Sequence, residues 1–189
     1  MKKLICFGDS ITAGEGFDDE SKYLVLRLQQ TFENWTVINA GVSGDNSRNA
    51  LARVERDVVK FNPDIVTVLF GANDAATHKM IGLTEFESNL TAIVSKIGPQ
   101  KTILISPAPV DEGKPRNRTN AIMEKYADRV RRVSEQSNCG FIDLFREMFA
   151  VTDYGHMLSD GLHFSEWGYE LLSELIVEKI RQVENYGNK

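Results

Sequence analysis

Leu4-Ile5-Cys6-Phe7-Gly8-Asp9-Ser10 is a short apolar run that ends in a glycine-containing polar turn. Similar runs, rich in branched side chains, recur at residues 37–38, 65–70, 102–105 and 141–142. Each run is followed by a polar or glycine-containing turn, a pattern typical of strands buried on both faces of a parallel sheet. The pattern therefore predicts a central sheet whose first strand leads directly into the turn at Ser10.

Segments with helical spacing of apolar residues lie between the predicted strands, and each would place one apolar face against the sheet. They contain Leu24 and Leu28; Leu51, Val54 and Val58; Phe86, Leu90, Ile93 and Ile97; Ile122, Tyr126, Val130 and Val133; and Leu172, Leu175, Ile176, Ile180 and Val183. This alternation predicts a three-layer α/β/α, flavodoxin-like fold with a mainly parallel sheet of about five strands. Because no linker or repeat interrupts it, we expect one domain over residues 1–189.

The predicted fold indicates where ligands bind, because parallel sheets of this kind hold them beyond the carboxyl ends of their strands. Three polar turns directly follow predicted strands, at residues 8–10, 41–45 and 71–74. The longest irregular stretch, residues 106–117, contains Pro107, Pro109, Gly113 and Pro115. We expect it to be a loop on the same rim and a wall of the substrate pocket.

Composition argues against polyanionic partners and against a membrane protein. The formal net charge is -5 with mixed signs, which supplies no basic surface for nucleic acid or anionic lipid. Two cysteines are too few for a disulfide framework. The apolar run at residues 4–7 is shorter than a secretory signal requires, and no run approaches the ~20 residues of a membrane span. We therefore expect a cytoplasmic protein without stable membrane association, and self-association is left open.

Ser10 is the candidate nucleophile. It lies where a buried strand ends and a polar turn enters a helix, and a helix N-terminus favours developing negative charge. The alternative is that Ser10 only caps the helix, with Gly8 easing the turn. A serine hydroxyl needs a base to accept its proton, so the prediction depends on a histidine that reaches it.

His163 is the candidate base, and Asp160 is the candidate residue that orients it. The two lie three positions apart in a short segment before the C-terminal helix, a spacing at which side chains face one another in a tight turn. The Asp160 carboxylate would accept the Nδ1 proton and leave Nε2 directed at the serine. The alternative makes both of them turn or surface residues. His78 and His156 lack an aspartate three residues earlier, and His78 is ranked second as base.

Gly44 and Asn73 are candidate donors for an oxyanion hole, the set of N–H groups that binds the negative oxygen of a tetrahedral intermediate. Gly44 lacks a Cβ and could bring its backbone N–H close to a substrate. Asn73 follows the central predicted strand and offers an uncharged amide donor. Alternatively, Gly44 is a loop glycine with positive φ and Asn73 closes an Asx turn. In that case the segments of Ser10, Gly44, Asn73 and His163 would match the parts of one catalytic mechanism only by coincidence.

These motifs resemble the SGNH hydrolase superfamily, also called GDSL-type esterases. The resemblance rests on residues 7–12, 39–45, 71–74 and 160–163, whose order and spacing agree with the superfamily, with Ile11 where leucine is usual. It implies Ser10 as nucleophile, His163 as base and Asp160 as orienter. It also implies an oxyanion hole formed by the backbone N–H groups of Ser10 and Gly44 and the Asn73 side chain. No metal or organic cofactor is implied.

Residues 106–112 and 158–172 look most like the branch of isoamyl-acetate-hydrolysing esterases. The resemblance thus implies an esterase that acts on small-molecule esters, with short acyl chains favoured. Thioesterase, lysophospholipase and carbohydrate deacetylase activities remain alternatives, because one catalytic set serves all of them. A flavodoxin-like domain that binds an anion at Ser10 and Gly44 without catalysis is the alternative from another class.

Overall fold

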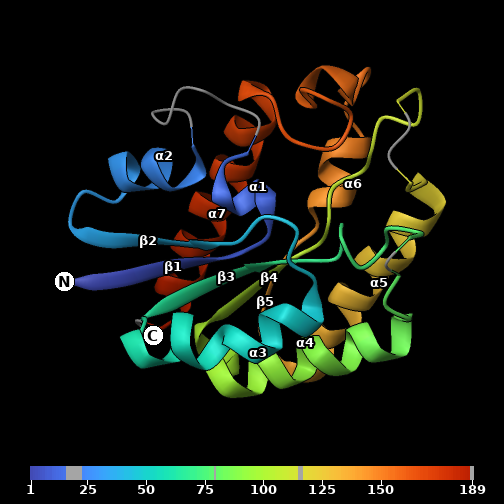
Figure 1. Cartoon of the computed structure of the whole chain (residues 1–189). Coiled ribbons are helices and arrows are strands. Elements are labelled where there is room, and N and C mark those ends of the chain that lie inside the picture. The colour runs from blue at the N-terminus through green and yellow to red at the C-terminus, as the bar shows by residue number, and fades with distance from the viewer. Residues whose placement is uncertain (16–22, 79, 115–116, 188–189) are drawn as a thin grey trace.

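The computed structural model of the chain describes residues 1–15, 23–78, 80–114 and 117–187 (Figure 1). Five strands form one sheet in the order β2-β1-β3-β4-β5, with all neighbouring pairs parallel. The strands are β1 (Lys2–Gly8), β2 (Trp35–Gly41), β3 (Ile65–Leu69), β4 (Thr102–Ile105) and β5 (Gly140–Ile142). Each of the predicted apolar runs therefore forms a strand.

Helices cover both faces of this sheet. The described helices are α1 (Ser10–Ala13), α2 (Leu24–Thr31), α3 (Ser47–Asp57), α4 (Leu83–Ile97), α5 (Asn120–Ser137), α6 (Leu144–Phe149) and α7 (Glu166–Gly187), with short 3₁₀ turns η2 (Val59–Phe61), η3 (Pro99–Lys101) and η4 (Tyr154–Met157). In Figure 1, α3 and α4 lie below the sheet and α2 lies above it. The predicted three-layer, flavodoxin-like fold is confirmed.

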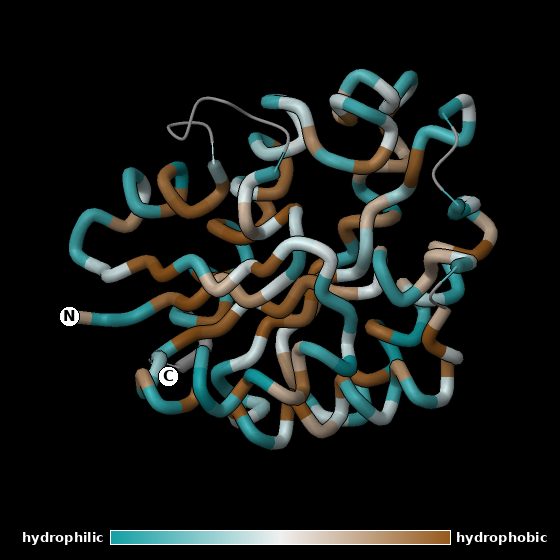
Figure 2. The backbone as a smooth tube through the Cα atoms, viewed as in Figure 1, coloured by the Kyte–Doolittle hydropathy of each residue, from teal (hydrophilic) through white to brown (hydrophobic). Residues whose placement is uncertain are grey.

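The core has two halves because successive strand residues point to opposite faces. In β1, Ile5 and Phe7 pack with residues of α3, α4 and α5, whereas Leu4 and Cys6 pack with residues of α2 and α7. All four side chains have no solvent exposure. Burial of such a side chain stabilises the fold by about 1.5–3 kcal/mol. Figure 2 shows hydrophobic segments concentrated in the central strands.

The strand order reverses its direction where the candidate residues lie. The chain leaves β1 through α1 and α2 towards β2 at the edge, and then crosses back to β3 on the other side of β1. The segments after β1 and β3 therefore diverge to opposite faces of the sheet, and sheets of this kind bind ligands at the carboxyl ends of two such strands. Ser10 follows β1 and Asn73 follows β3, so both lie at this point.

No helix in the part of the chain that the structure describes is both long and apolar enough to cross a membrane.

Candidate active site

Residues 8–10 form the turn that contains the candidate nucleophile, and we call it the nucleophile turn. It is held by the end of β1 and by a helix cap. The Asp9 carboxylate accepts a hydrogen bond from the backbone N–H of Ile11 at 3.0 Å, so Asp9, not Ser10, caps α1. A Cβ at Gly8 would lie 2.1 Å from the Thr12 hydroxyl oxygen, so only glycine fits this close turn. Ser10 is the first residue of α1 and is 7% exposed. The alternative that Ser10 serves as the helix cap is therefore wrong.

The Asp–His turn, residues 158–164, is a compact loop before α7. An antiparallel bridge joins Leu158 to Phe164, and the Ser159 backbone N–H donates to the His163 carbonyl at 2.8 Å. The Asp160 carboxylate accepts three hydrogen bonds inside this turn. One comes from the Leu162 N–H at 3.0 Å, one from the His163 N–H at 2.8 Å, and the third is a 2.9 Å contact with the His163 Nδ1.

The two turns meet beyond the carboxyl end of β1. The His163 Nε2 lies 3.1 Å from the Ser10 Oγ, although 153 residues separate them in the sequence. The Asp160 contact on Nδ1 favours the tautomer in which that nitrogen carries the proton, and this leaves Nε2 free to accept one. The structure thus brings the three predicted side chains into one hydrogen-bonded row.

Electrostatics favour the ionised form of Asp160. Partial burial would by itself raise the pKa of this carboxyl, but the hydrogen bonds from the His163 ring and from the backbone N–H groups of His163 and Leu162 outweigh it. The pKa is lowered from 3.8 to about 2. Asp160 therefore carries a negative charge beside the imidazole at any pH near neutrality.

The other two histidines do not share this arrangement. His78 is exposed, and it follows the turn after β3 without lying in the hydrogen-bonded row. The His156 Nδ1 lies 2.6 Å from the Asp153 carbonyl, and its ring contacts Trp167 edge-on at 5.6 Å. The geometry supports His163 over both rivals.

The candidate oxyanion donors Gly44 and Asn73 follow β2 and β3, the two strands that flank β1 in the sheet. The Asn73 Nδ2 donates to the Asp45 carbonyl at 2.8 Å, which joins the turn after β3 to the loop that contains Gly44. The Val42 N–H donates to the Gly8 carbonyl at 3.0 Å, which joins the same loop to β1. Gly44 has a φ of 79°, and a Cβ there would meet nothing within 4 Å. The positive φ, rather than a lack of space for a Cβ, thus explains why position 44 is a glycine.

Three comparisons with known proteins bear on this site. Residues 6–171 match the model of the GDSL-like Lipase/Acylhydrolase family, and this range includes every candidate residue named above. The chain belongs to the GDSL-like lipase/acylhydrolase family.

Named relatives of this GDSL-like chain are esterases. It is 31% identical to the human isoamyl acetate-hydrolyzing esterase 1 homolog, over 90% of the chain and 77% of that protein. It is 28% identical to an acetylxylan esterase of Geobacillus stearothermophilus, over 95% of the chain and 94% of that protein. A lipase/acylhydrolase from Enterococcus faecalis has a similar crystal structure, with a TM-score of 0.90, 36% identity and 96% coverage of both chains. The chain is thus an ester hydrolase, which argues against the non-catalytic anion-binding alternative.

Two arginines of this GDSL-like hydrolase support the site, and the sequence analysis did not identify them. Arg53 of α3 is buried; it donates to the Gly8 and Ala40 carbonyls, each at 2.9 Å, and pairs with Asp45 at 2.5 Å. Arg118 donates to the Asn73 Oδ1 at 3.0 Å. The sequence does contain a signal for Arg53, because an arginine between Ala50 and Val54 on the apolar face of a helix indicates a buried partner. Arg118 lies in an irregular segment, where helical spacing gives no signal.

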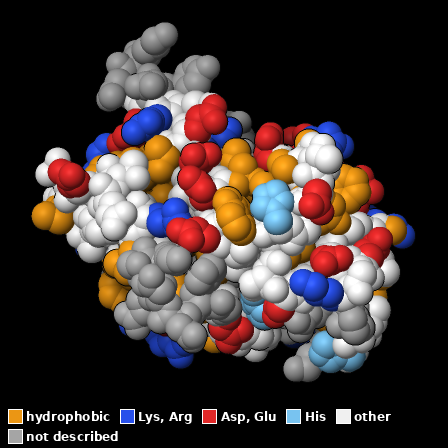
Figure 3. All heavy atoms as spheres, turned by 90° about the horizontal axis from the view of Figure 1, so that it is seen from above, with side chains coloured by type: hydrophobic (Ala, Val, Ile, Leu, Met, Phe, Trp, Pro, Cys, Tyr) orange, Lys and Arg blue, Asp and Glu red, His pale blue; other side chains and the backbone are white. Residues whose placement is uncertain are grey.

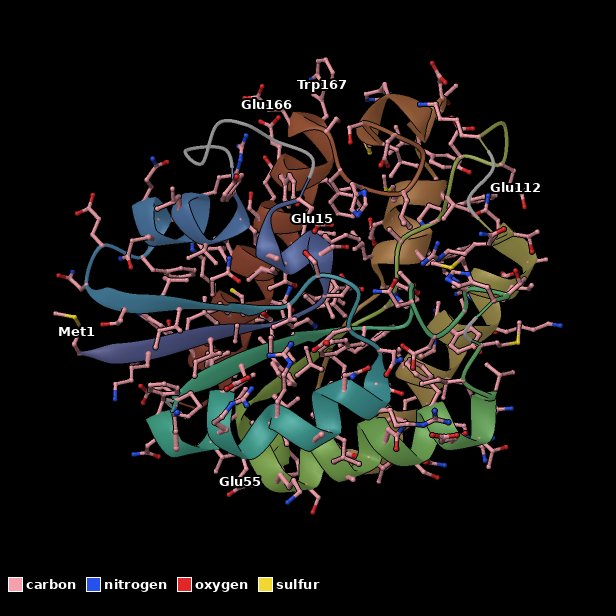
Figure 4. All side chains as sticks on the ribbon, in the orientation of Figure 1. Met1, Glu15, Glu55, Glu112, Glu166 and Trp167 are labelled. Atoms are coloured by element: carbon pink, nitrogen blue, oxygen red, sulfur yellow. The ribbon has the colours of Figure 1, made fainter. Side chains whose placement is uncertain are left out.

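Glu15 is a further residue at the site that sequence reasoning missed. Its carboxylate lies 3.5 Å from the His163 Nε2, the nitrogen that faces Ser10. Figure 4 labels it beside α1. The Glu15 side chain is 49% exposed. The imidazole thus has the Asp160 carboxylate on Nδ1 and a second, more solvated carboxylate beside Nε2.

The predicted wall loop, residues 106–117, lies against the Asp–His turn. The Asp111 N–H donates to the Gly161 carbonyl at 3.0 Å, and a Cβ at Gly161 would lie 2.9 Å from the Lys114 side chain. Asn120, at the start of α5, fixes the loop through both the N–H and the carbonyl of Val110. Pro115, one of the residues on which the prediction rested, lies outside the described residues.

Proposed function

We propose that this GDSL-like hydrolase is a serine esterase that cleaves carboxylic esters with short acyl chains through an acyl-enzyme intermediate. Ser10 is the nucleophile, His163 is the general base, and Asp160 holds the imidazole in place. The observation that supports this best is the 3.1 Å separation of the His163 Nε2 and the Ser10 Oγ, since a base must lie within about 2.6–3.2 Å of the atom whose proton it removes.

In the first step, the Ser10 Oγ attacks the ester carbonyl carbon while the His163 Nε2 takes the hydroxyl proton. The resulting imidazolium is stabilised by the Asp160 carboxylate, which the low pKa keeps ionised. The carbonyl oxygen gains a full negative charge. The backbone N–H groups of Ser10 and Gly44 and the side-chain amide of Asn73 are proposed to bind it.

The second half of the reaction reverses these roles. The tetrahedral intermediate collapses, the bond to the alcohol oxygen breaks, and the His163 Nε2 returns its proton to that oxygen. Water then enters, His163 takes one of its protons, and the hydroxide attacks the acyl-enzyme carbonyl. Collapse of the second intermediate releases the carboxylic acid and restores the Ser10 hydroxyl.

The relatives and the surface charge favour small, neutral esters. One relative is named for isoamyl acetate and another for acetylxylan, and both names refer to acetyl esters. Figure 3 shows acidic side chains spread over the face seen from above, and Glu15 places a carboxylate beside the catalytic imidazole. Because like charges repel, this arrangement supports a neutral ester over a polyanionic thioester such as an acyl-CoA. Acetyl removal from a carbohydrate is the second candidate, supported by the acetylxylan esterase relative.

Replacement of the nucleophile tests the reaction. We expect Ser10→Ala to reduce kcat for p-nitrophenyl acetate by roughly 10⁴-fold or more, because binding and the remaining donors alone give only residual catalysis. Ser95→Ala, an exposed serine of α4, is the matched control and should keep full activity. Full activity in Ser10→Ala would overturn the proposal.

A substrate series tests the acyl preference. Initial rates with p-nitrophenyl acetate, butyrate, octanoate and palmitate should fall as the chain lengthens, and acetate esters of isoamyl alcohol and of xylan should be cleaved faster than acetyl-CoA. A rate that rises from acetate to palmitate would contradict the short-acyl proposal and favour a lysophospholipase.

A further inference from the structure

The Arg118 guanidinium spans two acceptors at the end of β3. Its Nη2 donates to the Asn73 Oδ1 at 3.0 Å, and its Nε donates to the backbone carbonyl of Ala72. Arg118 precedes α5 and lies 45 positions along the chain from Asn73. Two donors of one planar group thus hold two consecutive residues of the turn, an arrangement that fixes direction as well as distance.

These contacts determine which way the Asn73 amide faces. An amide has an acceptor oxygen on one side and a two-hydrogen donor nitrogen on the other, whereas arginine only donates and a backbone carbonyl only accepts. The observed orientation pairs Oδ1 with Arg118 and Nδ2 with the Asp45 carbonyl at 2.8 Å. A flipped amide would set two donors against each other and two acceptors against each other. Arg118 therefore excludes the flipped state.

The fixed orientation serves the proposed chemistry. The bond to Asp45 uses one of the two Nδ2 hydrogens, and the second hydrogen is left for a substrate oxygen. An oxyanion donor lowers the barrier only when it already points at the position where charge develops, because reorientation during the reaction costs free energy. Without Arg118 the amide could rotate and present its oxygen, which would repel the oxyanion.

We infer that Arg118 is a positioning residue for the oxyanion hole, one that acts through Asn73 without contacting the substrate. The inference rests on the proposed function, because it requires Asn73 to donate to the oxyanion. It also assigns a role to the segment between the wall loop and α5. That segment contacts the turn after β3 through Arg118, whereas the loop that contains Gly44 contacts it through the Asp45 carbonyl.

Substitution of Arg118 separates this role from a structural one. Arg118→Met removes both donors, and we expect kcat for p-nitrophenyl acetate to fall roughly 10- to 100-fold with KM changed less than about threefold, because the lost interaction is made in the transition state. Arg118→Lys keeps one donor and should recover part of kcat. Arg129→Met, which removes a surface arginine of α5 that pairs with Glu87 at 2.6 Å, is the matched control and should leave both constants unchanged.

A double-mutant cycle with Asn73→Ala shows whether Arg118 acts through the amide. Asn73→Ala alone should lower kcat roughly 10²- to 10³-fold, and adding Arg118→Met should lower it no further. Melting temperatures of all variants check folding. If Arg118→Met retains wild-type kcat, or if its effect multiplies in full with that of Asn73→Ala, the positioning role is wrong while the esterase proposal stands. If Asn73→Ala retains full kcat, the proposed oxyanion hole fails and the role of Arg118 fails with it.

Discussion

The nucleophile turn and the Asp–His turn reach the same point by different means. The nucleophile turn is an extension of the sheet, since Gly8 pairs with Gly41 of β2 and with Leu69 of β3. The Asp–His turn follows η4 rather than a strand of the sheet, and hydrogen bonds inside the turn and the Leu158–Phe164 bridge hold its shape. The comparison shows that the proposed nucleophile lies on a sheet edge, whereas the proposed base lies in a loop that its own hydrogen bonds close.

Each turn contains an aspartate, and the two carboxyls differ in charge preference. Burial raises the pKa of Asp9 to about 7, whereas the hydrogen bonds around the less buried Asp160 lower its pKa to about 2. Asp160 is thus suited to stabilise a cation, and Asp9 is suited to cap α1 without a permanent charge. Residue type alone does not distinguish these roles, but the surroundings of each carboxyl do.

The largest expected effect comes from the Asp–His turn. Asp160→Asn keeps the size of the side chain but removes the charge that holds the imidazolium, so we expect kcat to fall roughly 10²- to 10⁴-fold. The melting temperature at neutral pH should change little, because the turn retains its backbone hydrogen bonds. Steady-state kinetics with p-nitrophenyl acetate provides the measurement, and a kcat within a factor of two of wild type would show that Asp160 has no part in catalysis.

A smaller effect is expected where the two turns are joined. The buried Tyr169 hydroxyl of α7 donates to the Ile11 carbonyl of α1 at 2.8 Å, which connects the helix after the Asp–His turn to the helix after the nucleophile. Tyr169→Phe removes this hydrogen bond, and we expect the free energy of unfolding to drop by about 1–2 kcal/mol. Urea denaturation measures this change. Tyr154→Phe, at a less buried tyrosine that donates to Val110, is the comparison variant with a smaller expected loss.

Equal stability of Tyr169→Phe and the wild type would mean that the two turns are not coupled through this bond.

The smallest effect is expected at Asp9 and depends on pH. An unfolded aspartate loses its proton near pH 4, but folded Asp9 retains it up to about pH 7. The folded state binds more protons in this interval, so its stability relative to the unfolded state falls as the pH rises from about 4 to 7. Asp9→Asn can still cap α1 and removes this slope. We expect it to gain about 1 kcal/mol over wild type between pH 5 and pH 6 in urea titrations; a constant difference across that range would contradict the assignment.

The difference between the two turns also explains what the sequence could predict. Ser10 and Asn73 follow buried apolar runs, so the period of the pattern and the rule for parallel sheets place both at one edge. The spacing of three residues between Asp160 and His163 predicts that their side chains face one another. Arg118 and Glu15 could not be found in this way, because their roles depend on how irregular segments fold back over the strand ends. No local pattern encodes that path.

Arg53, which supports the site, is partly predictable from the sequence. Its position on the buried face of α3 indicates a partner inside the fold, since a buried arginine requires acceptors. The sequence does not indicate that those acceptors are the Gly8 carbonyl beside the nucleophile and Asp45 beside Gly44. Packing of α3 against two strand ends determines that choice.

The most direct test is a crystal structure of the protein after reaction with a small fluorophosphonate, which forms a stable analogue of the tetrahedral intermediate. The account predicts phosphorus bonded to the Ser10 Oγ and the phosphonyl oxygen within about 3.1 Å of the Gly44 N and the Asn73 Nδ2. An adduct on another residue, or a phosphonyl oxygen directed away from both donors, would contradict it.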